Sequence, residues 1–270
     1  MTCEGFISLV KIPRVNPLED VQAYWEARPC GTDGDPFAEG SPEYFRWITE
    51  TRYRREPFIE KYARFEEWRG KDVLEVGVGA GTDAERFARS GARFTGVDLT
   101  EHGVRLARKR FESAGLPGRF ERGNAETLPF PDNEFDLVYS WGVIHHTPDM
   151  AAAAREIARV CRPGGRVCCM VYNRRSLYAF QGKLVYGWLR GKPGRPIEEI
   201  AAAHFESPGT RLSTKMDLFA LFPGFRDIRV SFEVTPYDLR IARRVFLPPW
   251  TRRLIPRSLG YFMVFEGVKS

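Results

Sequence analysis

Between residues 71 and 173, short apolar runs alternate with amphipathic helical segments, and this alternation restricts the fold more than any other feature of the chain. The apolar runs lie at 71–77, 92–100, 118–126, 134–143 and 162–173. Helical segments lie between them at 82–91, 101–115 and 149–161. Strands that alternate with such helices form right-handed βαβ units, and these build a parallel sheet covered on both faces. The pattern therefore predicts an α/β fold.

Domain boundaries are expected where this alternation begins and ends. The predicted regions are an N-terminal arm with helices at 1–69, a core at 70–173, a helical insertion at 174–224, and closing strands at 225–270 with an Arg- and Pro-rich insertion at 236–258. Ser41 is the expected N-cap of a helix that has Pro42 at its first position, and Pro57 should end or kink that helix. Segments 225–235 and 260–269 are expected to pair antiparallel at the sheet edge.

The segment EVGVGAGTD at 75–83 places a glycine-rich loop after the first strand. Open α/β sheets bind ligands at the carboxyl ends of their strands, and glycine permits close backbone approach there. The dinucleotide pattern G-x-G-x-x-G is not met, because Thr82 stands at its third glycine position counted from Gly77. Asp98 ends the second strand 21 residues after Gly77. A carboxylate at that point can accept hydrogen bonds from the ribose of either NAD or S-adenosylmethionine.

The next two strand ends add polar groups to the same edge. GNAETLPF follows the third strand, where the Asn124 amide and the Ala125 backbone N–H can pair with an adenine edge. YSWGVIHHTPD follows the fourth strand and brings two histidines to the same rim. Thr82 at the third glycine position and the GNAETLPF segment argue against NAD(P).

Four motifs, in this order and spacing, carry a resemblance to a known family: VLEVGVGAGTD, GVDLT, GNAETLPFPDNEFDLVYSWGVIHHTPD and EIARVCRPGG. Together they resemble the class I S-adenosylmethionine-dependent methyltransferases, in particular the small-molecule branch related to ubiquinone and sterol methyltransferases. The resemblance covers about residues 70–173. It implies a Rossmann-like, doubly wound, seven-stranded and mostly parallel sheet with an antiparallel last strand. It also implies a helical N-terminal lid, an inserted helical substrate cap, and S-adenosyl-L-methionine as cofactor with S-adenosyl-L-homocysteine as product.

The resemblance also implies roles for individual residues. Glu75 and the backbone of Gly77, Gly79 and Gly81 would face the methionine part of the cofactor. Asp98 would hold the ribose, and Leu99 would lie against the adenine. The remaining expected contacts are the amide oxygen of Asn124 on the adenine amino group, the N–H of Ala125, the flank of Glu126, and the carbonyl of Ser140 on the cofactor ammonium.

The catalytic candidates are His145, His146 and Tyr24. Histidine titrates near neutral pH and suits proton removal, and adjacent loop residues rarely face the same way, so we expect at most one of the pair to act as a base. The segment AYWEARP at 23–29 is expected to belong to the lid, where Tyr24, Trp25 and Arg28 can approach the substrate. The alternatives are a structural histidine pair and a docked helix without chemistry.

The substrate is expected beside a basic region. Residues 174–258 hold sixteen Lys and Arg against seven Asp and Glu, whereas the whole chain has a net charge of +6. A solvated face, a site for a carboxylate or phosphate, and contact with an anionic membrane surface that bears a lipid-like substrate all remain open. The named candidates for substrate binding, besides Trp25 and Arg28, are Tyr172, Arg174, Arg211 and Arg243, with Arg175 and Arg244 as further residues to test. No nucleic-acid partner is expected, because no recognisable binding module is present.

The composition limits the classes of protein to which the chain can belong. Five cysteines without C-x-x-C spacing predict neither a metal site nor a disulfide framework, and they favour the reducing cytoplasm. No stretch approaches the roughly 18 apolar residues of a membrane span, and no signal peptide is expected. The sequence thus predicts methyl transfer to O, N or C of a small molecule, with an acidic or lipid-like acceptor. A non-methylating S-adenosylmethionine-binding protein or cyclase, and an NAD(P)-dependent oxidoreductase, are the alternatives. The oligomeric state is not readable.

Overall fold

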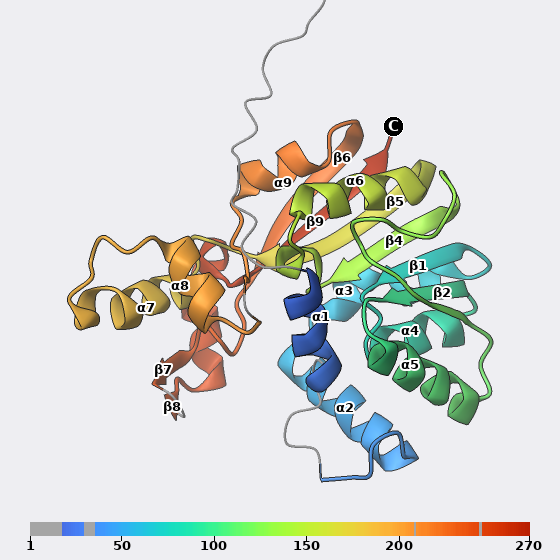
Figure 1. Ribbon diagram of the computed structural model, residues 1–270, viewed down its shortest axis with the longest axis horizontal. Coiled ribbons are helices and arrows are strands. Elements are labelled where there is room, and N and C mark those ends of the chain that lie inside the picture. Colours follow the sequence, from blue (N-terminus) through green and yellow to red (C-terminus); the bar gives the residue numbers. More distant parts are fainter. Residues whose placement is uncertain (1–17, 30–35, 208, 243–244) are drawn as a thin grey trace, which may run out of the picture.

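The computed structural model describes residues 18–29, 36–207, 209–242 and 245–270 (Figure 1). One central sheet organises the chain, and its strand order is β3-β2-β1-β4-β5-β9-β6. The strands are β1 (Asp72–Val76), β2 (Arg93–Asp98), β3 (Arg119–Arg122), β4 (Phe135–Trp141), β5 (Cys161–Tyr172), β6 (Phe225–Glu233) and β9 (Phe262–Lys269). The first five are parallel, while β9 runs antiparallel between β5 and β6. The predicted seven-stranded sheet with an antiparallel last strand is confirmed.

Helices cover both faces of this sheet. The helices that alternate with the parallel strands are α4 (Thr82–Arg89), α5 (Glu101–Ala114) and α6 (Met150–Val160). Neighbouring strand residues belong to different apolar clusters: Val73 and Cys168 pack in one, Leu74 and Cys169 in the other. Because successive strand side chains point to opposite faces, this division shows a two-sided core. Both cysteines are buried free thiols, as their apolar surroundings predict.

The N-terminal helices are α1 (Leu18–Ala27), α2 (Pro42–Arg55) and α3 (Ile59–Ala63), followed by the 3-10 turn η1 (Phe65–Trp68). The start predicted for α2 is confirmed, since Ser41 Oγ accepts a hydrogen bond from the N–H of Tyr44 at 3.1 Å and Pro42 is the first helical residue. The helix ends at Arg55, two residues before Pro57, because a residue before proline avoids helical backbone angles.

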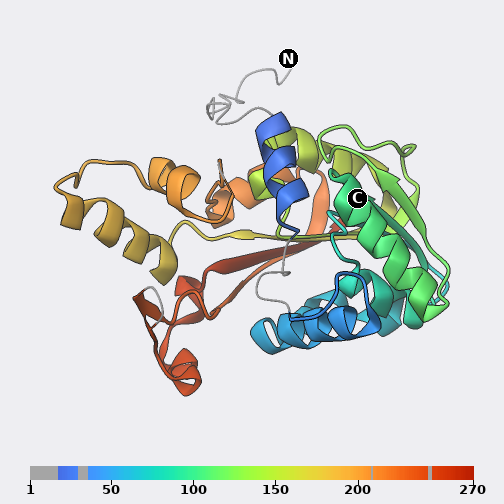
Figure 2. The same cartoon turned by 60° about the horizontal axis from the view of Figure 1, so that its bottom comes forward.

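The C-terminal third adds an outlying group of short elements. These are α7 (Leu177–Tyr186), η3 (Trp188–Arg190), α8 (Ile197–His204), α9 (Lys215–Leu221), β7 (Arg240–Ala242), β8 (Val245–Phe246), η4 (Pro249–Leu254) and η5 (Arg257–Leu259). In both views α7, α8 and the β7–β8 hairpin project from the side of the molecule away from β1–β3, whereas α9 packs beside α6 (Figures 1 and 2). The helix α8 was not predicted from the sequence. No helix in the described part of the chain combines the length and apolarity that crossing a bilayer requires.

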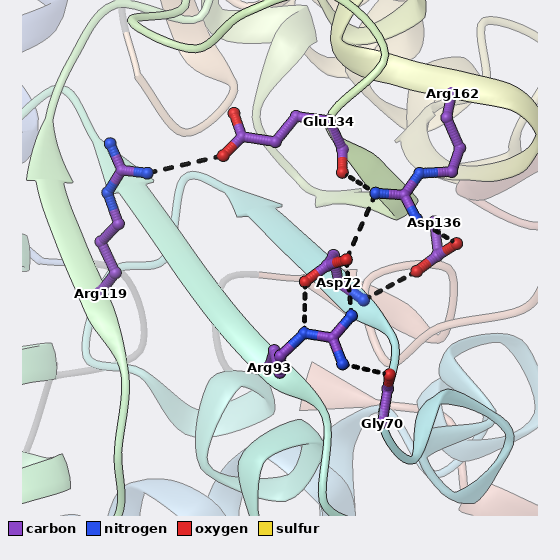
Figure 3. Close-up of polar contacts among 7 residues, drawn as sticks. All are labelled: Gly70, Asp72, Arg93, Arg119, Glu134, Asp136 and Arg162. Atoms are coloured by element: carbon purple, nitrogen blue, oxygen red, sulfur yellow. Dashed lines mark hydrogen bonds and ion pairs between the residues drawn. The ribbon is translucent and has the colours of Figure 1, made fainter.

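An ion-pair cluster fastens the amino ends of the strands, on the edge opposite the glycine loop (Figure 3). Arg93 forms two hydrogen bonds of 2.7 Å with the carboxylate of Asp72, and Arg162 bonds Asp136 at 2.8 Å. The Asp136 carboxylate also accepts the backbone N–H of Asp72 at 2.9 Å. The hydrogen bonds from Arg93, which outweigh partial burial, lower the pKa of Asp72. The cluster joins β1, β2, β4 and β5 and has a structural role.

Candidate active site

A cavity of about 460 Å³ lies at the carboxyl edge of the parallel strands. Its walls come from the loops after β1 to β4, from α1 and α2, and from the segment between β6 and β8. Residues predicted for the site that line it are Trp25, Glu75, Gly77, Gly79, Asp98, Leu99, Asn124, Ala125 and His146. Further lining residues include Arg52, Arg55, Glu56, Glu206, Tyr237, Arg240 and Phe246.

The glycine loop needs glycine for two different reasons. Gly77 has φ +80°, and a Cβ there would clash with the side chain of Val143. Gly79 has φ +50°, but a Cβ there would meet no atom within 4 Å. Because Gly79 lines the cavity, that Cβ would occupy space that a ligand can use. Gly81 is not a lining residue: it is the N-cap of α4 and packs against Ala107.

The Asp98 carboxylate fixes this loop from the end of β2. Its Oδ2 accepts the N–H of Gly79 at 2.8 Å, and its Oδ1 accepts the N–H and hydroxyl of Thr100 at 2.9 and 2.6 Å. Burial raises the pKa of Asp98, although the hydrogen bonds from Thr100 and Gly79 oppose that rise. Asp98 therefore has a structural role in the loop in addition to the predicted role at the ribose.

Glu75 lies on the cavity wall, and a second acidic residue, Asp83, lines the cavity as well. It is 4% exposed, and its Oε2 has no hydrogen-bond partner among the described residues. Burial, and then the nearby Asp83, raise the pKa of Glu75 well above its usual value. A buried carboxyl oxygen without a partner costs free energy unless something donates to it. Glu75 thus offers the cavity an unused acceptor.

The Asp83 carboxylate accepts hydrogen bonds from three side chains. Arg52 donates to it from Nη2 at 2.5 Å, and the hydroxyls of Tyr53 and Tyr139 donate at 2.9 and 3.0 Å. Burial opposes ionisation of Asp83, but Arg52 and the tyrosine hydroxyls outweigh it and lower its pKa. The positive charge of Arg52 on the cavity wall is therefore already paired.

Three residues predicted to contact the adenine and ammonium groups have other surroundings in the structure. The Asn124 amide oxygen accepts the N–H of Glu126 at 3.0 Å in a local turn. Glu126 is not a lining residue, and its carboxylate accepts the N–H of Asp149 at 2.6 Å. Ser140 is fully buried inside β4 and does not line the cavity. Asn124 and Ala125 remain at the wall.

The two histidines occupy different environments. His145 is fully buried and lies against the Tyr172 ring, with ring centroids 3.9 Å apart and the ring planes tilted by 43°. Burial, and then His146, lower the pKa of His145 well below its usual value, which keeps the ring neutral. His146 lines the cavity, and its Nδ1 lies 2.7 Å from Ser207 Oγ and 3.2 Å from Thr210 Oγ1. The structure thus brings one of the pair to the cavity.

A glutamate that sequence reasoning missed completes this corner. Glu206 lies between α8 and α9 at φ +33°, and its Oε2 is 3.5 Å from His146 Nε2. The same carboxylate accepts the hydroxyl of Tyr172. Burial would raise the pKa of Glu206, but His146 and Tyr172 outweigh it and lower that pKa. No local motif surrounds Glu206 in the sequence, so only the fold reveals its place.

The helix α1 connects this corner with the start of α5. Trp25 meets the His146 ring edge-on, with centroids 5.1 Å apart, and the Tyr24 hydroxyl donates to the backbone oxygen of Glu206 at 3.0 Å. The Glu26 carboxylate accepts the backbone N–H groups of Glu101 and His102, both at 3.0 Å. Tyr24 itself is not a lining residue.

The remaining predicted substrate residues lie away from the cavity wall. Arg28 is exposed beside the Tyr24 ring, Tyr172 is buried behind His145, and Arg174 pairs with Glu198 at 2.7 Å. Arg211 donates to the backbone oxygen of Pro148 at 2.6 Å, which directs its guanidinium elsewhere. Arg243 and Arg244 lie outside the described residues. The cationic side chains at the wall are instead those of Arg52, Arg55 and Arg240.

Comparison with known proteins agrees with this geometry. Residues 74–169 match the methyltransferase domain family. Over 98 residues the chain is 45% identical to a fatty-acid O-methyltransferase of Mycolicibacterium smegmatis, covering 36% of this chain and 35% of that protein. It is 43% identical over 98 residues to the phthiotriol/phenolphthiotriol dimycocerosates methyltransferase of Mycobacterium tuberculosis, covering 36% of each. The aligned part thus spans about a third of the length of both relatives.

Solved structures extend the likeness of the fold to nearly the whole chain. Magnesium protoporphyrin IX methyltransferase from Synechocystis, solved with bound S-adenosylhomocysteine, superposes with a TM-score of 0.59 at 16% identity, covering 93% of this chain and 98% of that one. A 4+2 cyclase gives a TM-score of 0.51 at 20% identity and covers 95% and 92%. Residues 74–169 are thus similar to a methyltransferase domain, and the chain has the Rossmann-like fold of the solved methyltransferase structures.

Proposed function

We propose that this protein transfers the methyl group of S-adenosylmethionine to a hydroxyl oxygen of a lipid-like small molecule. One observation carries the choice of acceptor: His146 lines the cavity and has the Glu206 carboxylate 3.5 Å from its Nε2. A hydroxyl group must lose a proton when it is methylated, whereas an ionised carboxylate has none to lose. A histidine supported by a carboxylate suits that proton removal.

The cavity fits the cofactor through this chain's own residues. Glu75 offers an unpartnered buried oxygen where the methionine ammonium needs an acceptor, and Gly79 leaves room for close approach of a ligand to the backbone. Asp98 would take the ribose, while Leu99 and Ala125 would flank the adenine. Gly81, Glu126 and Ser140 would support the wall from outside. When bound, S-adenosylmethionine supplies an activated methyl group.

The other side of the cavity would hold and orient the acceptor. Trp25 and Phe246 provide apolar surface, and Glu56, whose carboxylate accepts the indole N–H of Trp141 at 2.7 Å, adds a fixed polar group. Orientation of two reactants can contribute ~7–11 kcal/mol to catalysis. We assign proton removal to His146, orientation of its ring to Ser207 and Glu206, and closure over the cavity to the helix α1. Tyr24 and His145 act indirectly, through Glu206 and Tyr172.

A carboxylate acceptor is the second candidate, since Arg55 and Arg240 also line the cavity. Formation of S-adenosylhomocysteine should be measured with a long-chain alcohol and with the matching fatty acid. We expect turnover of the alcohol, and a loss of about 10²–10⁴-fold in kcat for His146→Gln with that acceptor. His204→Gln is the matched control, because His204 stacks on Tyr186 away from the cavity.

The outcomes separate the alternatives. Turnover of the fatty acid alone, unaffected by His146→Gln, would replace the hydroxyl proposal with the carboxylate one. Tight binding of S-adenosylmethionine without product from either acceptor would favour a non-methylating protein or a cyclase, a role that occurs on this fold.

A further inference from the structure

The surface far from the core carries an unusual concentration of exposed apolar side chains. Eight of the eleven large apolar side chains that are exposed in the described part of the chain lie in two short segments. The first, 180–189, holds Phe180, Val185, Trp188 and Leu189. The second, 246–254, holds Phe246, Leu247, Trp250 and Leu254. We call these segments the two apolar tips. Leu189 and Leu254 are 73% and 72% exposed, so neither tip is covered by the fold.

Both tips are basic as well as apolar. Between residues 180 and 195 the chain has four Lys or Arg and no Asp or Glu, and between 246 and 258 it has three Arg and again no acid. Arg190, Lys192, Arg253 and Arg257 are all exposed. Of the cations counted, Arg195 is paired with Glu199 on α8, whereas Glu198 on that helix pairs with Arg174. The exposed side chains of Arg190, Lys192, Arg253 and Arg257 carry the positive charge of the two tips.

The two tips stem from one joint on the same side of the molecule (Figures 1 and 2). Asp238 holds this joint together: its carboxylate accepts the N–H groups of Thr235 and Tyr261 at 2.8 and 2.9 Å. Arg240, just before the second tip, donates to the Tyr178 hydroxyl on α7 at 2.9 Å. Both tips thus have a common base, which is fixed to the start of β9.

The joint is also part of the cavity wall. Tyr237, Arg240 and Phe246 line the cavity, and Phe246 is 53% exposed as well. One side chain therefore belongs both to the candidate active site and to the second tip. Any surface to which the two apolar tips bind would therefore lie next to the part of the cavity wall that Phe246 forms.

We propose that the two apolar tips dock the protein on an anionic lipid bilayer. Tryptophan and leucine side chains enter the interfacial layer, while Arg and Lys bind acidic headgroups. Exposed apolar patches rimmed by charge mark interaction sites, and here the uniformly basic rim selects an acidic lipid surface over a neutral protein partner. The inference rests on the proposed function only in its purpose, which is to bring a lipid-like acceptor to Phe246 and the cavity.

Vesicle sedimentation tests the proposal without cofactor or acceptor. We expect the full chain to sediment with vesicles in which phosphatidylglycerol replaces part of the phosphatidylcholine, and to bind pure phosphatidylcholine far less. Added salt should release it, because screening weakens contacts between charges at a surface. No binding to the anionic vesicles would overturn the proposal.

Variants then locate the contact. A variant with Trp188→Ser and Leu189→Ser in one tip, and Trp250→Ser and Leu254→Ser in the other, should lose binding by about tenfold or more. Met216→Ser is the matched control, since Met216 is 71% exposed on α9, outside both tips. Thermal unfolding checks that the tip variant is folded. Equal vesicle binding by the tip variant and the control would overturn the assignment.

Two further readouts distinguish the remaining outcomes. If gel filtration showed that the tips join two copies of this chain, and the tip variant became monomeric without any change in vesicle binding, the bilayer would be the wrong occupant. The tip variant should keep its turnover of a short, water-soluble alcohol while losing turnover of a bilayer-embedded acceptor. Loss of vesicle binding with intact soluble turnover supports docking, and absence of all turnover would count against the proposed function alone.

Discussion

At the residue scale, Glu75 shows how a binding site can lower stability. Burial and the neighbouring Asp83 raise its pKa, so the folded state holds the Glu75 proton more tightly than the unfolded chain, where the pKa is about 4.3. The stabilising contribution of that proton is complete below about pH 4 and is lost as the pH rises toward the raised pKa. At neutral and higher pH the environment of Glu75 therefore opposes folding.

Glu75→Gln should accordingly stabilise the ligand-free protein at high pH. We expect the free energy of unfolding to rise by ~1 kcal/mol or more at pH 8 and to change little at pH 4. Affinity for S-adenosylmethionine should fall in the same variant. Urea unfolding at the two pH values measures the first effect, with the exposed Glu50→Gln as control. A variant no more stable than wild type at pH 8 would mean that Glu75 has a compensating partner.

Gly79 and Gly115 form a matched pair for testing the cavity. Both have positive φ, and a Cβ on either would meet nothing within 4 Å, but only Gly79 lines the cavity. Alanine at either position should lower the free energy of unfolding by about 1–2 kcal/mol, because the left-handed conformation strains any side chain. Calorimetric titration should show a loss of cofactor affinity for Gly79→Ala alone. Equal affinities in the two variants would remove Gly79 from the binding site.

At the element scale, α1 is fastened by its polar contacts more than by packing. Val21 is the buried residue of the helix, whereas Glu26 accepts the two backbone N–H groups at the start of α5. An anionic side chain at a helix N-terminus is stabilising, since unsatisfied N–H groups and the helix dipole both favour negative charge there. The same end of α5 follows Asp98, so the lid contact and the ribose candidate are neighbours.

Glu26→Gln should loosen α1 without unfolding the core. Hydrogen exchange in residues 18–27 should accelerate, the dissociation of S-adenosylmethionine should become faster, and the Tm should change little. Glu19→Gln, on the exposed face of the same helix, is the control. If exchange is unchanged in Glu26→Gln, packing of Trp25 and Val21 holds the helix instead.

The elements also show how far sequence patterns reach. Ser41 and Pro42 mark the start of α2, and the sheet follows from its alternation, because these signals are local. The helix α8 was missed, since IEEIAAAH is short and lies between loops. Glu206 could not be found either: its contacts with Tyr172 and His146 join residues 34 or more positions apart in the chain.

At the scale of the whole molecule, one half of the site consists of residues that the sequence predicts, and the other half consists of residues that it does not. Gly77, Gly79, Asp98 and His146 follow strands whose carboxyl ends meet at one edge, so their convergence follows from the sheet. The opposite wall, with Arg55, Arg240 and Phe246, comes from segments without a common motif. Arg174 and Arg211 were predicted to bind substrate only because their region is basic. In the structure Arg174 pairs with Glu198, Arg211 donates to the backbone oxygen of Pro148, and neither lines the cavity.

Ligand binding should stabilise the molecule as a whole, because the two halves of the cavity meet only in the folded chain. At a concentration of S-adenosylhomocysteine one hundred times its Kd, the free energy of unfolding should increase by ~2.7 kcal/mol. For a chain of this size the Tm should rise by roughly 5–10 °C. NADH at the same concentration should produce no rise, since Thr82 replaces the third glycine of the dinucleotide pattern.

Asp98→Ala isolates the cofactor's share of this effect. The variant should be less stable without ligand, because the N–H of Gly79 and the hydroxyl of Thr100 lose their acceptor. The rise in Tm on adding S-adenosylhomocysteine is the quantity to compare, and it should disappear. A rise equal to that of wild type would show that Asp98 only holds the loop, and a rise with NADH would revive the oxidoreductase alternative.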